Sequence, residues 1–284
     1  MAAHRCRLVS VLPMLISVVV TTYNQPDWLE KVLWGLAAQT DRDFELRVAD
    51  DGSGPETRAV LDRAGPHLGV PIHHIWQPHT GFGKCAILNR AIAGAAGDYH
   101  VFLDGDCIPR RDFLSVHRAL ARPGRFLSGG ALRLPLHTSQ ALRRDDIQSG
   151  RAFGPRWLRA RGAPWSVRLA RLAAGPGLAR WLDRLTPTRP TFNGGNASAW
   201  RADVVAANGF DERMGHGGLD REFGARLANA GLRGRQVRHR AVVLHLDHPR
   251  GYRNAETVRR NREIWTETET SGRTRAVVGL DRYP

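Results

Sequence analysis

Short apolar segments alternate with helical segments over the first hundred residues, and this alternation restricts the fold more than any other feature of the chain. The predicted strands cover residues 15–22, 44–49, 71–76 and 99–104. Three helices are predicted between these strands. The first has Asp27 as a possible N-cap, the second begins at Pro55, and the third runs from Lys84 to residue 95. Short apolar strands joined by helices pair in parallel and are covered on both faces. The sequence therefore predicts an α/β fold with a mostly parallel central sheet.

Polar residues follow three of these strands at the point where each strand ends. They are the stretches TTYN from Thr21, DDGS from Asp50 and DGD from Asp104. In parallel α/β sheets, ligands bind beyond the carboxyl ends of the strands. The sequence therefore predicts a binding site at this edge of the sheet.

The stretch HVFLDGDCIP ends an apolar strand with two carboxylates, Asp104 and Asp106, separated only by a glycine. In an extended segment the two side chains point the same way, and like charges side by side are unfavourable unless a cation lies between them. Carboxylate oxygens with one histidine nitrogen fit Mn²⁺ or Mg²⁺ better than a zinc cage. An isolated Asp-Gly-Asp more often forms a simple turn. Here, however, the tripeptide stands at the end of a buried strand, and this position favours the metal interpretation.

The net charge of +15 is the one unusual feature of the composition, which is otherwise that of a globular protein. Lys31 and Lys84 are the only lysines, so 40 of the 42 basic residues are arginine. Genomic base composition accounts for part of such a bias. Contacts with phosphates, nucleotides or an anionic membrane are the functional alternatives.

The cysteines and the N-terminal segment indicate the compartment. Cys6, Cys85 and Cys107 are odd in number and lack CxxC spacing, which argues against a disulfide scaffold or a zinc ribbon and suits a reducing compartment. The apolar run before residue 22 is broken by Pro13 and has no small-residue cleavage site, so residues 1–14 are expected to be a disordered leader rather than a signal peptide. No other segment reaches the about 20 apolar residues of a membrane span. We expect a cytoplasmic protein, with peripheral contact on the inner face of the cell membrane left open.

Residues 151–190 differ from the rest of the chain. They hold nine arginines against a single acid, Asp183, together with three tryptophans. A mobile lid, an acceptor platform, an interfacial membrane contact and an irregular solvated insertion are all consistent with this composition. Further on, a helix with Phe223 and Leu227 on one face and Gly231 as its stop is followed by a strand over 241–246 and a polar helix over 252–270.

Six segments, taken in order, carry a resemblance to a known family. They are SVVVTTYNQPDWLEKVLWGLAAQT, VADDGS, HTGFGKCAILNRAI, YHVFLDGDCIP, FNGGNASAWR and GHGGLDREFGARLANAG. Over residues 15–250 the chain resembles the family 2 glycosyltransferases with a GT-A fold, in particular their chondroitin-polymerase-like and galactosyltransferase-like bacterial branch. The resemblance implies a single GT-A domain with a Rossmann-like nucleotide-binding half over 15–110 and an acceptor half over 111–250 that includes the insertion 151–190. A helical tail over 251–284 would follow.

The resemblance also implies roles for individual residues. Asp51 would contact the uracil ring and ribose, Lys84 the nucleotide or a phosphate, and Asp106 the metal directly. The lesser alternative for Lys84 is a core-facing helix position with an extended ammonium. His245 would lie near the metal, and His248 is a competing candidate. The implied nucleotide-sugar-binding set is Thr21, Tyr23, Asp51, Lys84, Asp104, Asn193, Gly194, Gly195 and Gly218, and the implied metal set is Asp104, Asp106 and His245.

The catalytic base implied by the resemblance is Asp220. Relatives commonly read W-G-G-E-D where this chain reads HGGLD, so His216 replaces the aromatic residue, Leu219 replaces the first acid, and Asp220 retains the final acid. Because Asp220 sits at the start of a helix, we expect a lowered pKa and an ionised carboxylate.

The resemblance, together with the acids at the strand ends, implies a metal-dependent, inverting glycosyltransferase of polysaccharide or cell-surface glycan synthesis. It would move a sugar from a nucleotide donor, in particular a UDP-sugar, to a hydroxyl of a glycan or a lipid-linked acceptor. A nucleotidyltransferase is the alternative enzyme class, but it would require a glycine-rich, basic phosphate loop after the first strand, and TTYNQPDW has neither feature. A nucleic-acid-binding protein would fit the charge, yet no recognition motif supports it.

Overall fold

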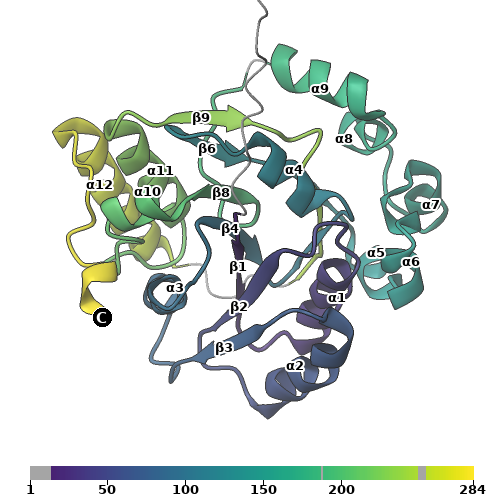
Figure 1. Cartoon of the computed structure of the whole chain (residues 1–284), viewed down its shortest axis with the longest axis horizontal. Helices are drawn as coiled ribbons and strands as arrows, with labels where there is room; N and C mark the ends of the chain where they lie inside the picture. Colours follow the sequence, from purple (N-terminus) through teal and green to yellow (C-terminus); the bar gives the residue numbers. More distant parts are fainter. Residues whose placement is uncertain (1–13, 187, 249–253) are drawn as a thin grey trace, which may run out of the picture.

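The computed structural model describes residues 14–186, 188–248 and 254–284, and it contains two sheets with helices on both sides (Figure 1). Almost all of the predicted leader lies outside the described residues. Its last residue, Met14, is buried in the core, so the leader prediction is wrong at this position.

The central sheet has the strand order β3-β2-β1-β4-β8-β6-β9. Its first four strands are β1 (Ile16–Thr22), β2 (Phe44–Asp50), β3 (Ile72–Trp76) and β4 (Tyr99–Asp104), and they pair in parallel as predicted. In the register, Val20 of β1 lies between Val48 and Leu103. The three polar strand ends therefore meet at one edge of the sheet.

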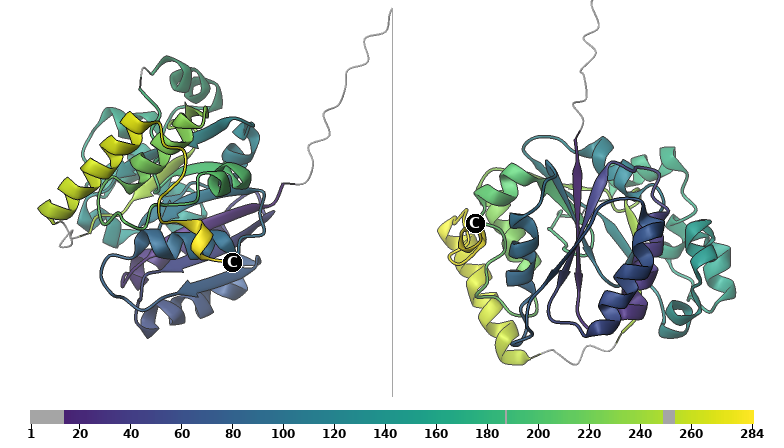
Figure 2. Two further views of the ribbon diagram at one scale, coloured as in Figure 1. Left: turned by 90° about the vertical axis from the view of Figure 1, so that its left-hand side faces the viewer. Right: turned by 60° about the horizontal axis from the view of Figure 1, so that its bottom comes forward.

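Side chains of β1 alternate between two hydrophobic cores, one on each face of the sheet. Ile16, Val18 and Val20 pack with α1 (Pro26–Ala37) and α2 (Pro55–Leu68), whereas Val19 packs with α3 (Lys84–Ala93). Figure 2 shows α1 and α2 on one face and α3 with the C-terminal helices on the other. The N-cap of α1 is Gln25 rather than Asp27, because Pro26 occupies the first helical turn.

The second half of the chain extends the same sheet and adds a smaller one. Strands β8 (Ala197–Trp200) and β6 (Arg125–Ser128) pair antiparallel, β8 pairs antiparallel with β4, and β9 (Arg233–Gln236) pairs in parallel with β6. The smaller sheet has the order β5-β10-β7 and consists of β5 (Cys107–Pro109), β7 (Gly130–Arg133) and β10 (Val242–His245). Since β4 and β8 share one sheet, the two halves form one domain.

The arginine-rich segment forms three short helices along one side of the molecule (Figure 1). These are α7 (Pro155–Ala160), α8 (Val167–Arg171) and α9 (Pro176–Leu185), and they follow α5 (Leu136–Ala141), α6 (Arg144–Gln148) and the 3₁₀ turn η1 (Arg151–Phe153). Each of the three helices buries an apolar residue, which is Leu158, Leu169 or Ala179. The interpretation as an irregular insertion is therefore wrong.

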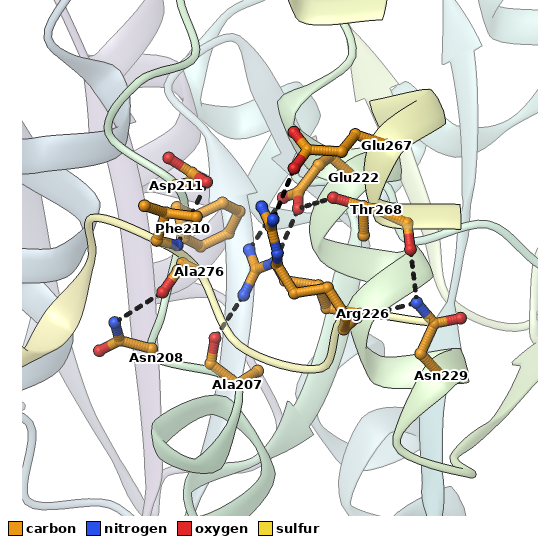
Figure 3. A network of polar contacts seen from close by, with 12 residues as sticks. Ala207, Asn208, Phe210, Asp211, Glu222, Arg226, Asn229, Glu267, Thr268 and Ala276 are labelled. Atoms are coloured by element: carbon orange, nitrogen blue, oxygen red, sulfur yellow. Dashed lines mark hydrogen bonds and ion pairs between the residues drawn. The ribbon is translucent and has the colours of Figure 1, made fainter. Parts of the chain in front are cut away.

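The C-terminal segment packs against the domain instead of extending from it as a tail. Helix α12 (Ala255–Ser271) lies against α11 (Leu219–Asn229), and the chain ends with η2 (Leu280–Arg282). Figure 3 shows the polar network between the two helices. Arg226, fully buried, binds Glu222 at 2.8 and 2.9 Å, and Thr268 of α12 donates to Glu222 at 3.0 Å. The first residues of the predicted helix 252–270 lie outside the described residues.

The remaining helices are α4 (Phe113–Leu120) and α10 (Arg201–Ala206). Within the described part of the chain, no helix combines the length and the apolar character needed to cross a membrane.

Candidate active site

A cavity of about 700 Å³ opens at the carboxyl ends of β1, β2 and β4. The loop that precedes α11 and the segment that follows β10 form other parts of its wall. The lining includes Thr21, Tyr23, Asp51, Lys84, Asp104, Asp106, Asn193, Gly195, Gly218, Asp220, His245 and His248. The structure therefore brings together residues up to 227 positions apart in the chain, from Thr21 to His248.

Lys84 and Asp104 form an ion pair within this cavity. The Lys84 ammonium lies 2.6 Å from Asp104 Oδ1, and the Thr21 hydroxyl donates to the same oxygen at 3.0 Å. Burial alone would lower the pKa of Lys84, but Asp104, Asp220 and Asp106 raise it above its ordinary value. Lys84 is thus a permanent cation inside a group of acids, and its ammonium lies in the cavity rather than in the core.

Asp106 lies beside two histidines. His248 Nε2 is 2.9 Å from Asp106 Oδ2 and His245 Nε2 is 3.7 Å from it, so all three side chains can direct ligand atoms at one point. Burial would raise the pKa of Asp106, but the hydrogen bond from His248 and the charge of His245 lower it. One carboxylate and two imidazoles form a donor set that fits a divalent cation. The sequence treated His245 and His248 as competing candidates, whereas the structure brings both to Asp106.

Asp104 and Asp106 converge, but for a different reason from the one the sequence suggested. Asp104 ends β4, and Gly105 and Asp106 form a turn before β5. Ligand atoms of Asp104, Asp106 and Cys107 lie within 4.8 Å of one another. The turn, rather than the alternation of side chains along a strand, therefore directs both carboxylates into the cavity.

Asp220 is the second residue of α11, and its Oδ1 is shielded from solvent without a hydrogen-bond partner among the described residues. Burial raises the pKa of Asp220; Lys84 opposes this increase and Asp104 adds to it. The expectation of a lowered pKa at the helix N-terminus is therefore wrong, because burial outweighs the helix dipole. A carboxylate with one shielded oxygen that has no partner among the described residues, and with increased proton affinity, is suited to accept a proton.

Two glycines allow the backbone to approach the acids of the cavity. A β-carbon on Gly194 would lie 2.4 Å from Asp220 Oδ1, and one on Gly195 would lie 2.8 Å from Asp104 Oδ2. Contacts this short do not occur with real side chains, so any larger residue at either position would have to displace the neighbouring carboxylate.

Asp51 lies at the end of the cavity formed by the loop before α3. Its carboxylate accepts hydrogen bonds from Gln77 Nε2 at 2.6 Å and from the Gly83 amide at 2.8 Å. Beside it, the Tyr23 and His79 rings stack with their centroids 4.2 Å apart. Because a carboxylate can accept further hydrogen bonds, Asp51 and the stacked rings together can bind a planar polar group such as a nucleobase.

The loop before Asp220 is held by a residue that the sequence analysis did not single out. Asn261 of α12 donates to the carbonyls of Gly215 at 2.9 Å, His216 at 3.1 Å and Gly217 at 2.6 Å, and it accepts from the Gly215 amide at 3.1 Å. A polar residue in a polar helix gives no signal of such a role. His79 was equally missed, although it opens the HTGFGK stretch used for the resemblance.

Comparisons with known proteins agree with this geometry. Residues 17–128 match the family model described as Glycosyl transferase family 2. A chondroitin synthase from Escherichia coli is 27% identical over 248 residues, which cover 82% of this chain and 35% of the synthase. Residues 17–128 are therefore similar to the family 2 glycosyltransferase domain.

Solved structures show the fold of this glycosyltransferase domain. A mannosyltransferase from Pyrobaculum calidifontis, in complex with GDP-Man and Mn²⁺, matches with a TM-score of 0.56 and 24% identity over 84% of this chain and 58% of the other. TarS from S. aureus, in complex with UDP-GlcNAc, matches with a TM-score of 0.61 and 17% identity over 91% of this chain and 69% of the other. The prediction of a GT-A fold is therefore confirmed. The chain spans about half or less of the length of the curated relatives that it matches.

Proposed function

We propose that the chain is a metal-dependent, inverting glycosyltransferase that moves a sugar from a nucleotide donor to a hydroxyl of a glycan or lipid-linked acceptor. The observation that carries this proposal is the joint presence, in one cavity, of a cation-binding set around Asp106 and a buried carboxylate, Asp220, without a hydrogen-bond partner at Oδ1 among the described residues. We further propose that residues 15–110 hold the donor and that the described residues of 111–250 hold the acceptor.

The metal set would consist of Asp106, His245 and His248, with Asp104 next to it. Two imidazoles favour Mn²⁺ over Mg²⁺, since Mg²⁺ prefers oxygen ligands and retains its waters. A divalent cation at this position would act as a Lewis acid that stabilises the departing nucleoside diphosphate. Lys84 adds a permanent positive charge on the same side of the cavity.

The residues of the chain position the two substrates and move one proton. Asp51 would bind the base and ribose, and the Tyr23–His79 pair would stack against the nucleotide. Asn193, Gly194, Gly195 and Gly218 would contact the donor sugar and the acceptor through their backbone and the Asn193 amide. Asp220 would take the proton of the acceptor hydroxyl as that oxygen attacks the anomeric carbon from the face opposite the diphosphate. This in-line geometry inverts the anomeric configuration.

A uridine donor is our proposal for the nucleotide, because the carboxylate of Asp51 can accept a hydrogen bond from the uracil ring N–H. The guanine ring also presents N–H donors, so a panel of donors must include GDP-sugars. UDP-sugars and GDP-sugars should be compared by thermal shift and by donor hydrolysis, with Mn²⁺, with Mg²⁺ and with EDTA. We expect a UDP-sugar with Mn²⁺ to give the largest shift.

Two substitutions test the assigned roles. Asp106→Asn should abolish transfer and its dependence on Mn²⁺, and Asp220→Asn should abolish transfer while donor binding stays nearly unchanged. The control Asp62→Asn changes an exposed acid on α2 that pairs with Arg58. Near-normal turnover in either active-site variant would contradict its role. Release of pyrophosphate instead of nucleoside diphosphate would identify a nucleotidyltransferase.

We also propose that the protein works at the inner face of the cell membrane, where α9 provides the contact. Leu178, Trp181 and Leu185 lie on one face of α9 and are 53%, 57% and 55% exposed. Arg180 and Arg184 lie beside this face, which suits anionic headgroups.

Flotation with vesicles that contain anionic lipid tests this contact. The triple change of Leu178, Trp181 and Leu185 to serine should abolish flotation. Val205→Ser on α10, where the side chain is 42% exposed, should not affect it. Equal flotation of the triple variant and the wild type would refute the proposed membrane contact.

A further inference from the structure

A second cavity of about 700 Å³ lies on the other side of Asp220 and is lined by arginines. Asp220, Asn193, Gly218, Ala131 and Arg133 line both cavities, so the two are continuous around the proposed base. We name the second one the arginine cavity. Its arginines are Arg133, Arg168, Arg171, Arg189, Arg221 and Arg238.

The two cavities differ in charge. Four acids line the cavity around Asp106, namely Asp51, Asp104, Asp106 and Asp220. Among the described residues, Asp220 is the only acid that lines the arginine cavity. Acids require a cation to hold a diphosphate, and arginines bind an anion directly. The charge pattern therefore assigns the two sides of Asp220 to different kinds of ligand.

The arginines of this cavity form no ion pair with an acid of the described chain, whereas the nearby Arg240 does. Arg240 binds Asp183 at 2.6 Å, but within the described residues no ion pair is formed by any of the six arginines that line the cavity. Burial lowers the pKa of Arg238, and the charges of Arg171 and Arg168 lower it further, so these guanidinium groups repel one another; Asp183 opposes this decrease without reversing it. Unpaired like charges around a concave surface are unfavourable until an anion lies between them.

Part of this cluster comes from the segment 151–190. Arg168 and Arg171 are one turn apart on α8, so both point to the same side of that helix. Arg238 follows β9 and donates to Gln236 at 3.2 Å. Arg221 is next to Asp220 in the chain and stacks over Trp265. The positive charge is therefore assembled from separate segments around the face of Asp220 that an acceptor would occupy.

We propose that the acceptor is an acidic glycan whose carboxylate or phosphate groups lie near the hydroxyl that is glycosylated. This inference rests on the proposed function and adds the chemical class of the acceptor to it. The hydroxyl binds at Asp220, and the neighbouring anionic group binds the guanidinium groups of α8 and of Arg238. Arginine suits this role because its planar fork binds carboxylate and phosphate through two hydrogen bonds.

The test compares three acceptor probes by calorimetry and by transfer kinetics. Oligogalacturonate supplies carboxylates, oligo(glycerol phosphate) supplies phosphodiesters, and a malto-oligosaccharide is the neutral counterpart. We expect one of the two acidic probes to bind at least about tenfold more tightly than the neutral one and to lose this advantage as salt is raised. The better acidic probe identifies the source of the negative charge.

The double variant Arg168→Glu, Arg171→Glu should raise the KM of the acidic acceptor at least about tenfold and change the donor KM far less. Arg156→Glu is the matched control, since Arg156 is an exposed arginine of the same segment and does not line the cavity.

Three results would contradict either the proposed acidic acceptor or the proposed transferase function. Equal binding of neutral and acidic probes would overturn the inference. A rise in donor KM instead of acceptor KM would also overturn it, because the arginines would then hold the donor. Absence of Mn²⁺-dependent donor hydrolysis, with arginine-dependent binding of an acidic probe retained, would refute the proposed transferase and leave the anion site standing.

Discussion

Gly194→Ala is the sharpest test of the position of Asp220, because the structure specifies the size of the perturbation. The added β-carbon would lie 2.4 Å from Asp220 Oδ1 and 2.9 Å from its Cγ, whereas ordinary contacts begin at 3.4 Å. The carboxylate must therefore move by about 1 Å, and a misplacement of that size at a reacting group costs about a hundredfold in rate. We expect kcat to fall by about a hundredfold while donor KM changes little.

The assay combines steady-state kinetics with thermal unfolding. Gly177→Ala on α9 is the matched control, because its β-carbon meets nothing within 4 Å. Gly195→Ala provides a contrast: its β-carbon lies 2.8 Å from Asp104 Oδ2, so we expect its main effect on donor KM and on the Mn²⁺ concentration required.

Two outcomes would refute the reasoning. One is a Gly194→Ala enzyme whose kcat stays within about threefold of the wild type, since a 1 Å shift of an essential base cannot be silent. The other is full additivity of Gly194→Ala with Asp220→Asn, because two changes that act through the same carboxylate should not add.

Three further predictions concern stability. Arg226→Met leaves Glu222 as a buried unpaired charge and should lower the free energy of unfolding by about 3–5 kcal/mol in urea titrations. A decrease of less than about 1 kcal/mol would contradict the stabilising role of this ion pair. Asn261→Ala removes the donor to three loop carbonyls and should lower the free energy of unfolding by about 1–3 kcal/mol in the same titrations. We expect kcat to fall as well. An unchanged kcat would show that the loop keeps its shape without Asn261. Burial lowers the pKa of His100 from 6.5 to about 3. The neutral His100 therefore costs no unfolding free energy above pH 6.5, and the free energy of unfolding falls by about 1.4 kcal/mol per pH unit as the pH decreases below that value. His100→Leu should therefore reduce the loss of unfolding free energy between pH 7 and pH 5 by about 2 kcal/mol, as followed by urea unfolding, whereas the exposed His67→Leu should not.

Local pattern was sufficient to predict the strands and helices of residues 15–104. The strand predicted at residues 99–104 is β4 with the same bounds, and the strand predicted at 15–22 differs from β1 by one residue. These elements follow from short apolar runs bounded by polar turns, and such signals are contained in neighbouring residues. The polar strand ends meet at one edge because parallel pairing leaves no other arrangement.

Local reasoning failed where burial or a turn outweighed it. The chain at Asp106 turns instead of continuing β4, so the two carboxylates converge by a different geometry from the one expected. At Asp220, the helix dipole predicts a lowered pKa, but burial raises it. Burial of a side chain depends on what packs over it, and that is not encoded in its neighbours along the chain.

The sequence by itself determined the order of strands and helices over the first hundred residues, the acids at the strand ends and the family resemblance, because each depends on residues close together in the chain. Only the tertiary structure decided that His245 and His248 both reach Asp106, that Asn261 holds the loop before Asp220, and that arginines from α8 and from the segment after β9 surround one cavity. Those groupings arise from packing between distant segments, which no local periodicity records.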